Sequence, residues 1–350
     1  MMFCSEKALV HPHETVPAMD DHQQAFENQR ILVTGGAGMI GSTLTKRLCE
    51  YDAAEVIVLD DLSSGYRWLL PDDERITFVE GDILDEEKLK RVFTSDLDYV
   101  YHLAAHFANQ NSVDHPETDL MVNGMGTLKL LQYTQLAGVD RFVYASSGCG
   151  VYGHDSSLPF SEEDVSMSLD TPYQVTKTLG ELYTNYFYNL YDLPIANARF
   201  FNTFGPGEVP GKYRNVIPNF FYWSYHDRAL PITGDGKETR DWTHVNDIVS
   251  GLCAMGAVDD AIGGVFNLAT GAETRVIDMA EAILERTGNE AGIRYIDRRN
   301  WDNKARIVGN IDRSREVLGY EPEWEFHTGL DTVQEWFEAN TDRIEAAAEF

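Results

Sequence analysis

The chain has 350 residues and a formal net charge of −29, from 57 acidic against 28 basic residues. Such a surface repels phosphate backbones, so we exclude nucleic acid as a partner. No apolar run reaches the roughly 18 residues of a membrane span, and the N-terminus lacks a signal-peptide pattern, so we expect no membrane association and a cytoplasmic protein. The four cysteines are scattered without a CxxC pair, which predicts neither disulfides nor a metal site.

The acidic residues are spread along the chain and do not form one tail. Two interpretations of this charge are open. One is adaptation to high salt, where the self-repulsion of a charged surface is screened. The other is an ordinary acidic cytoplasmic enzyme.

Residues 1–29 lack clear apolar periodicity, and we expect them to form a flexible N-terminal extension. Order is predicted to begin at Arg30, where apolar runs start to alternate with helical stretches. The predicted strands are 31–33, 56–59, 76–80, 99–103, 141–145 and 195–200, and the predicted helices between them are 40–51, 86–94, 117–137 and 172–192. This alternation is typical of a parallel sheet covered on both faces, so we predict an α/β fold with a doubly wound, Rossmann-type domain over 30–202.

The pattern changes after about residue 203, where glycine and proline mark irregular loops. Helices are predicted at 245–257 and 276–287, followed by a final amphipathic helix at 330–348. We therefore expect 203–350 to be mainly a smaller C-terminal α/β substrate-binding region, with segments that return to the Rossmann domain.

A glycine-rich turn follows the first predicted strand and opens the first predicted helix. Gly35, Gly38 and Gly41 have the GxxGxxG spacing, which permits a tight turn, close approach of the backbone to a pyrophosphate, and close packing of helix on strand. The pyrophosphate would lie over free N–H groups at the helix N-terminus. Asp60 ends the second strand, where an acid accepts hydrogen bonds from ribose hydroxyls. Because Asp60 and Asp61 together would repel a 2′-phosphate, we predict NAD as the cofactor.

The second motif is a tyrosine and a lysine at the start of a predicted helix. Tyr173 and Lys177 are four residues apart and therefore share one helix face. A lysine cation beside a phenol favours the phenolate, which could act as a general base toward a sugar hydroxyl. The pair is informative because the cofactor motif precedes it.

With these motifs the chain resembles the extended short-chain dehydrogenase/reductase family, in its NAD-dependent nucleotide-sugar epimerase/dehydratase branch. The resemblance covers roughly residues 30–340. It rests on TGGAGMIG at 34–41, VLDDLSSG at 58–65, GDI at 81–83, HLAA at 102–105, YASS with VYG at 144–153, PYQVTK at 172–177, RFFNTFGPG at 199–207, GDGKETRDWTHVNDI at 234–248 and FNLATG at 266–271.

The resemblance implies a cofactor site and a role for each matching block. The aspartate of GDI would flank the adenine, the residues of HLAA would line the cofactor, and Lys177 would hold the nicotinamide ribose. The implied cofactor-binding set is Gly35, Gly38, Met39, Ile40, Gly41, Asp60, Asp82, Ile83, Leu103, Ala104, Ala105, Tyr173 and Lys177.

The resemblance also implies a nucleotide-diphosphate sugar as substrate and a homodimer. Asn202 would contact the phosphate or the sugar, and Arg240 and Arg299 would bind the diphosphate, which guanidinium forks match well. The helices around 117–137 and 172–192 would pack against those of a second copy as a four-helix bundle. From their positions, His106 and Lys212 are further candidates for contact with the substrate.

One position departs from the family pattern. Most relatives carry a Ser or Thr that binds the reacting hydroxyl together with the tyrosine, and here that position is Gly148. Three explanations are open: Ser147 reaches the sugar, water fills the gap, or Cys149 is the working group.

Cys149 and Gly150 stand where family 4,6-dehydratases place an acid and a base, which argues against 4,6-elimination. A cysteine in this segment is also found in relatives that epimerise C3 or C5 through an enol, where a thiol exchanges a proton with carbon. We therefore list Tyr173, Lys177, Ser147 and Cys149 as catalytic candidates.

The leading hypothesis is an NAD-dependent nucleotide-sugar epimerase that inverts C4 through a transient 4-keto sugar. One alternative is C3/C5 epimerisation with Cys149, and another is a dehydratase or decarboxylase. A hypothesis of a different class is a non-catalytic NAD-binding sensor or scaffold.

Overall fold

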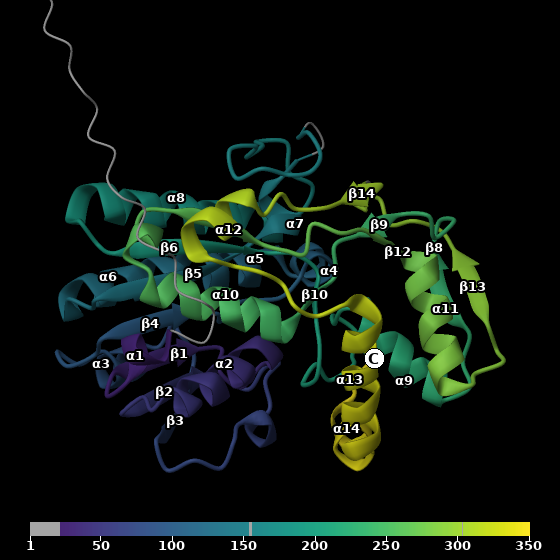
Figure 1. The fold of residues 1–350 in the computed structure, drawn as a ribbon, viewed down its shortest axis with the longest axis horizontal. Coiled ribbons are helices and arrows are strands. Elements are labelled where there is room, and N and C mark those ends of the chain that lie inside the picture. The colour runs from purple at the N-terminus through teal and green to yellow at the C-terminus, as the bar shows by residue number, and fades with distance from the viewer. Residues whose placement is uncertain (1–21, 154–155, 303) are drawn as a thin grey trace, which may run out of the picture.

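The protein is described from a computed structural model, which covers residues 22–153, 156–302 and 304–350. Figure 1 shows a large sheet with helices on both faces, beside a smaller region built from the C-terminal half of the chain. Among the residues so covered, no helix has both the length and the apolar character needed to span a membrane.

The large sheet has seven parallel strands. They are β1 (Arg30–Thr34), β2 (Glu55–Asp60), β3 (Ile76–Glu80), β4 (Tyr99–His102), β5 (Arg141–Ser147), β6 (Ile195–Phe200) and β11 (Val265–Leu268). Their order is β11-β6-β5-β4-β1-β2-β3, so the order reverses between β1 and β4. Ligands of doubly wound sheets bind at such a reversal, outside the carboxyl ends of the strands. The Rossmann-type prediction is confirmed.

Two apolar cores cover the two faces of this sheet. On one face α2 (Met39–Glu50) and α10 (Val245–Ala257) pack in the first core. On the other face α3 (Glu86–Val92), α6 (Thr127–Ala137) and α8 (Pro172–Tyr191) form the second. Strand β5 is buried along its whole length, as expected for a central strand of a parallel sheet.

The predicted helix 117–137 is helical throughout but not uniform. It consists of α5 (Pro116–Asp119), the π-helical segment η3 (Leu120–Gly126) and α6, and α4 (Asn109–Asp114) precedes it. A Cβ atom at Gly126 would lie 2.5 Å from Cδ1 of Ile83, so this wide turn packs closely on the segment after β3. π-helical turns occur frequently at functional sites.

The smaller region holds a third core. Its sheets pair β8 (Leu230–Thr233) with β13 (Ile293–Ile296), β7 (Thr203–Phe204) with β10 (Thr243–His244), and β9 (Thr239–Arg240) with both β12 (Thr274–Arg275) and β14 (Arg306–Ile307). The helices α9 (Val216–Tyr225), α11 (Val276–Thr287) and α13 (Phe326–Ala339) pack on these sheets.

Three sequence expectations need correction. Order begins before Arg30, because α1 (Gln23–Phe26) places Phe26 fully in the first core; residues 1–21 of the expected extension lie outside the described residues. The final helix is two helices, since α13 starts at Phe326 and α14 (Thr341–Ala347) follows a break at Asn340. Strand β11, α9 and α12 (Asp312–Leu318) were not predicted.

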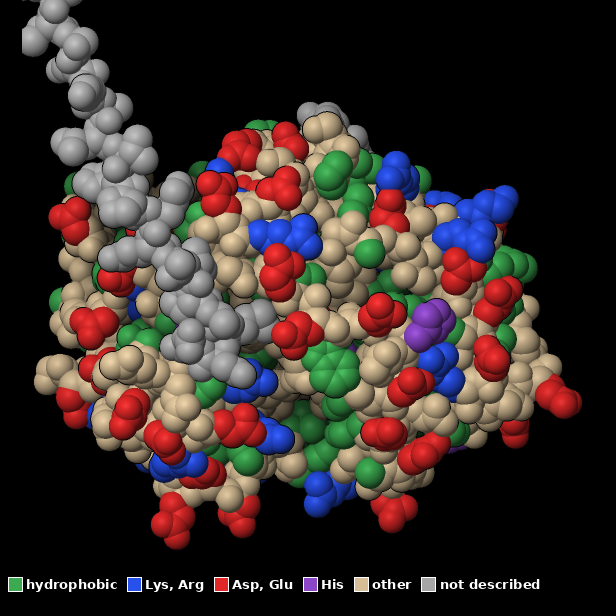
Figure 2. All heavy atoms as spheres, in the orientation of Figure 1, with side chains coloured by type: hydrophobic (Ala, Val, Ile, Leu, Met, Phe, Trp, Pro, Cys, Tyr) green, Lys and Arg blue, Asp and Glu red, His purple; other side chains and the backbone are tan. Residues whose placement is uncertain are grey.

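The acidic surface is diffuse. Figure 2 shows acidic side chains distributed over the visible face, with lysine and arginine interspersed among them. This distribution agrees with the spread of acids along the chain.

Candidate active site

The glycine turn between β1 and α2 cannot carry side chains at two of its positions. Gly35 has a φ of +70°, and a Cβ there would lie 2.6 Å from the backbone nitrogen of Ala104. A Cβ at Gly41 would lie 2.2 Å from the carbonyl oxygen of Gly35. Because Gly38 caps α2 without a side chain, the first N–H groups of the helix face the cavity beside the turn. These features fit a pyrophosphate.

Asp60 braces this turn from the end of β2. Its carboxylate accepts hydrogen bonds from the backbone N–H groups of Ala37 and Leu62, each at 2.9 Å. Burial raises the pKa of Asp60, and these two backbone donors lower it in part. The carboxylate lines the cavity, so it is available to further donors there.

One cavity brings the predicted cofactor residues together. The turn, Asp60, Asp82 and Ile83 line it, and so do Leu103, Ala104, Ala105, Tyr173 and Lys177. The cavity extends to the C-terminal region, where Arg214 donates to the carbonyl oxygen of Ser64. Residues from both parts of the chain therefore enclose it.

Tyr173 and Lys177 are both buried on the first two turns of α8. Burial raises the pKa of Tyr173, and the nearby side chain of Ser147 lowers it in part. Burial lowers the pKa of Lys177 to about 8, and the charge of Asp119 opposes this effect. Nζ of Lys177 donates to the carbonyl oxygen of Ala145 at 2.9 Å and lies 5.7 Å from the ring centre of Tyr173.

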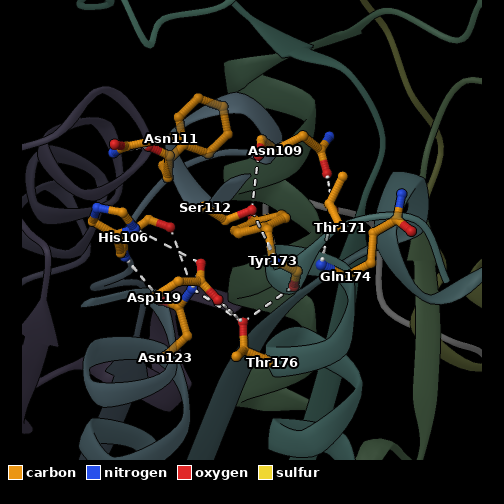
Figure 3. A network of polar contacts seen from close by, with 11 residues as sticks. His106, Asn109, Asn111, Ser112, Asp119, Asn123, Thr171, Tyr173, Gln174 and Thr176 are labelled. Carbon is orange, nitrogen blue, oxygen red and sulfur yellow. Dashed lines mark hydrogen bonds and ion pairs between the residues drawn. The ribbon is translucent and has the colours of Figure 1, made fainter. Parts of the chain in front are cut away.

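The start of α8 is held by a polar network (Figure 3). Thr171 caps the helix, and Pro172 occupies its first position, which suits the fixed φ of proline. The N–H of Tyr173 donates to Oγ of Ser112 at 3.0 Å. Oγ1 of Thr176 donates to the fully buried carboxylate of Asp119 at 2.7 Å. These contacts with α4 and α5 fix the position of the Tyr173 backbone.

His106 lies at the edge of the same network. Asn123 accepts from its N–H at 2.8 Å and donates to its carbonyl oxygen at 3.2 Å. Its Nδ1 is 3.8 Å from Oδ1 of Asp119, and the residue lines the first cavity. Its backbone is thus clamped while its ring faces both a buried carboxylate and the cavity.

Gly148 has no hydroxyl to offer the phenol of Tyr173, but the neighbouring Ser147 has one. Ser147 ends β5 and is 7% exposed, and its side chain lies close enough to Tyr173 to lower the pKa of the phenol. A Cβ at Gly148 would lie 2.2 to 2.7 Å from three ring atoms of Phe201. A Cβ at Gly150 would lie 3.2 Å from Oγ of Ser147. The two glycines therefore make room for Phe201 and for the Ser147 hydroxyl.

Cys149 lines the first cavity and a second one that adjoins it. Its thiol donates to Oδ1 of Asn202 at 3.4 Å. Burial raises the pKa of the thiol, so the protonated form prevails at neutral pH. Nucleophilic or basic thiols need the opposite shift.

The second cavity carries most of the predicted substrate residues. Asn202, Lys212, Arg240 and Arg299 line it. The Arg240 guanidinium is partly engaged, because it donates to two backbone carbonyls and pairs with Asp302 at 3.3 Å. Five cations and three acids line this cavity, a local excess of positive charge in a chain of −29: Lys212, Arg214, Arg240, Arg299 and Lys304 against Asp170, Glu238 and Asp302.

Sequence reasoning missed four residues of this site. Asp119 lies within a predicted helix and Phe201 within a family block. Nothing in their spacing indicates that Asp119 is a buried carboxylate or that the ring of Phe201 packs against Gly148 and Gly309. Arg214 and Lys304 lie in the region of weak periodicity. They reach the site through tertiary folding, which a local pattern does not reveal.

The fold and the site are those of an NAD-binding protein of the doubly wound class, with a second cavity beside the one that the glycine turn lines. Residues 31–269 match the NAD dependent epimerase/dehydratase family, and the chain belongs to this family. It is therefore an NAD-dependent enzyme of the nucleotide-sugar epimerase/dehydratase group.

Individual relatives cover nearly the whole chain. A UDP-glucose 4-epimerase of Mycolicibacterium smegmatis is 36% identical over 88% of this chain and 98% of its own. An epimerase structure from Methanothermobacter thermautotrophicus is 61% identical, with a TM-score of 0.94 over 95% of this chain and 98% of that one. A UDP-glucose 4-epimerase of Thermotoga maritima, solved with UDP-glucose, is 31% identical, with a TM-score of 0.85 over 89% and 100%.

Proposed function

We propose that the chain is a UDP-sugar 4-epimerase that keeps NAD bound and regenerates it in each turnover. The observation that carries the proposal is the placement of Tyr173 and Lys177 in the cavity that begins at the glycine turn. The 4-epimerase names of relatives at 36% and 31% identity support it.

The residues of the first cavity fit NAD. The glycine turn would hold the pyrophosphate, and Asp60 would accept hydrogen bonds from the adenosine ribose. Asp82 and Ile83 would flank the adenine. When bound, the cofactor takes up a hydride from a sugar carbon and gives it back.

Tyr173 acts as the general base and acid at the sugar hydroxyl. Without a positive neighbour its buried phenol would stay protonated, since burial raises its pKa. The Lys177 cation favours the phenolate, so it makes proton removal feasible at neutral pH. The 4-keto sugar that results rotates in the cavity and presents its other face. Tyr173 then returns the proton to the C4 oxygen, which forms the new hydroxyl. Ser147 supplies the second hydroxyl that the family pattern assigns to the position of Gly148.

The second cavity holds the nucleotide diphosphate. Its cations offset the roughly two negative charges of a diphosphate, whereas the acidic surface elsewhere repels them. Arg299 and Arg240 provide planar donors, and Asn202 lies between the two cavities. Lys212 lines the second cavity, and His106 lines the first.

C3 or C5 epimerisation with Cys149 is the second candidate, because the thiol lies in both cavities. The raised pKa and the hydrogen bond to Asn202 count against a thiolate. The 4-epimerase reaction needs no group besides Tyr173, Lys177 and the cofactor, whereas an enol needs one more acid or base.

We also infer a homodimer. Exposed apolar side chains follow one face of α8, and others cover η3: Val175, Leu182, Tyr186 and Leu190 on α8, and Leu120, Met121 and Met125 on η3. The two segments pack on each other. Exposed apolar surface of this extent is typical of an interface with a second copy.

Replacing the phenol tests the proposal. Tyr173→Phe should lower kcat by about 10²- to 10⁴-fold, the usual contribution of a general base, and leave the NAD content of the purified protein unchanged. Tyr183→Phe removes a hydroxyl from the same helix outside both cavities and is the matched control. Full activity of Tyr173→Phe on UDP-sugars would contradict the assignment.

A further inference from the structure

Two amide side chains beside the proposed reaction centre have fixed orientations. Oε1 of Gln174 accepts the N–H of Asp170 at 2.6 Å. Oδ1 of Asn109 accepts the hydroxyl of Thr171 at 2.7 Å, and that hydroxyl also accepts the N–H of Gln174. With both oxygens engaged, the amide nitrogens must point elsewhere, and Figure 3 shows both of them on the same side, away from the network.

Both nitrogens are free to bind a ligand. Neither donates a hydrogen bond within the part of the chain that the structure describes, although Gln174 is only 4% exposed. Both residues line the second cavity together with Cys149 and Asn202. A ligand in this cavity can therefore accept hydrogen bonds from both nitrogens.

Lys304 adds a cation to the same cavity. Its Nζ donates to the carbonyl oxygens of Cys149, at 3.1 Å, and of Tyr152. Burial lowers the pKa of this lysine, while Cys149 and Asp170 act on it at longer range in the opposite direction. Amide NH₂ and ammonium groups are donors without acceptor capacity in these orientations, so the wall formed by Asn109, Gln174 and Lys304 offers donors to a ligand. We refer to these three residues as the donor wall.

We propose that the donor wall binds a carbonyl oxygen carried by the substrate sugar, either the carboxylate of a uronate or the acyl group of an acetamido sugar. The inference rests on the proposed function and specifies its substrate class. A hydroxyl group also accepts hydrogen bonds, but its own proton finds no acceptor on the donor wall. A carbonyl oxygen brings no proton and therefore fits a wall of donors better.

The test compares three sugars on the NAD-loaded enzyme: UDP-glucose, UDP-N-acetylglucosamine and UDP-glucuronate. We expect kcat/KM for at least one carbonyl-bearing sugar to exceed that for UDP-glucose by about tenfold, which is the value of one to two net hydrogen bonds. Gln174→Glu and Asn109→Asp keep the shape and the engaged oxygen of each side chain but replace the free NH₂ by an acceptor. Each should lower that preference by about fivefold or more while NAD content stays unchanged.

Two further variants separate the sources of the carbonyl and the effect of charge. If the carboxylate is the ligand, Lys304→Met should lower kcat/KM for UDP-glucuronate far more than for UDP-N-acetylglucosamine. If the acyl group is the ligand, kcat/KM should fall only slightly, and equally, for both sugars. Gln135→Glu adds the same charge at an exposed position of α6 that lines neither cavity, so the preference should stay within about twofold.

UDP-glucose turnover at least equal to that of both other sugars would overturn the inference and leave the proposed function standing. A preference that survives both Gln174→Glu and Asn109→Asp would overturn it as well. Turnover of none of the three sugars would contradict the proposed function, and the inference with it.

Discussion

Burial and charge act against each other at Tyr173 and Lys177. Burial alone favours the neutral phenol and the neutral amine, since it raises the pKa of Tyr173 and lowers that of Lys177 to about 8. A catalytic pair needs the charged forms of both. The buried carboxylate of Asp119 favours the charged amine but raises the pKa of Tyr173 further, so the phenolate depends on the positive charge of Lys177.

This balance predicts the alkaline limb of the pH profile. The amine of Lys177 is charged below its pKa of about 8 and neutral above it, so its support for the phenolate is present at lower pH and lost as pH rises through that value. We expect kcat/KM to fall with an apparent pKa near 8 in the wild type. Lys177→Arg stays charged, so its profile should lack this limb up to roughly pH 10. An unchanged limb in Lys177→Arg would assign it to another group.

Gly148 predicts the outcome of restoring the residue that relatives carry. Gly148→Ser forces its Cβ against the ring of Phe201, so it should destabilise the protein by about 1–3 kcal/mol and give no gain in activity. Ser147→Ala should lower kcat by about tenfold or more, whereas Ser147→Thr keeps the hydroxyl and most of the activity. Thermal unfolding and initial rates measure both effects. Recovery of Ser147→Ala by an added Gly148→Ser would show that residue 148 can supply the hydroxyl.

At the scale of elements, α8 joins the reaction centre to the surface. Its first turn carries Tyr173 into the cavity, and its later turns expose apolar side chains. The apolar periodicity of 172–192 predicted this helix correctly. The network that holds its start could not be predicted, because Ser112, Asp119 and Thr176 meet through tertiary contacts of α4 and α5 with α8.

The exposed face of α8 makes the dimer testable. Leu182 is 59% exposed on this face, and Leu182→Glu places a charge within the inferred interface, where it would be desolvated. We expect the wild type to sediment as a dimer and Leu182→Glu to shift toward the monomer. Met167→Glu, at a position 88% exposed and outside α8, is the control and should remain dimeric. A monomeric wild type at working concentration would contradict the inference.

For the whole molecule, the sequence predicts the Rossmann half far better than the C-terminal half. A buried strand such as β5 is mainly apolar, so it can be predicted from its own residues without knowledge of the strands that pair with it. Strands such as β9 have two residues, and their existence depends on pairing with β12 and β14 from distant segments. The same holds for the site: the glycine turn and Tyr173–Lys177 are local motifs, whereas Lys304 and Arg214 reach the cavities only in the folded chain.

The fate of carbon-bound hydrogen distinguishes C4 epimerisation from enol chemistry. The NAD-loaded enzyme is incubated in D₂O with UDP-sugars, and the product is examined by NMR and mass spectrometry. C4 epimerisation returns the same hydride to the sugar, so we predict a C4 epimer without deuterium on carbon, formed equally by Cys149→Ala. Deuterium at C3 or C5 that disappears in Cys149→Ala would establish enol chemistry instead, and a product lighter by water or carbon dioxide would contradict epimerisation altogether.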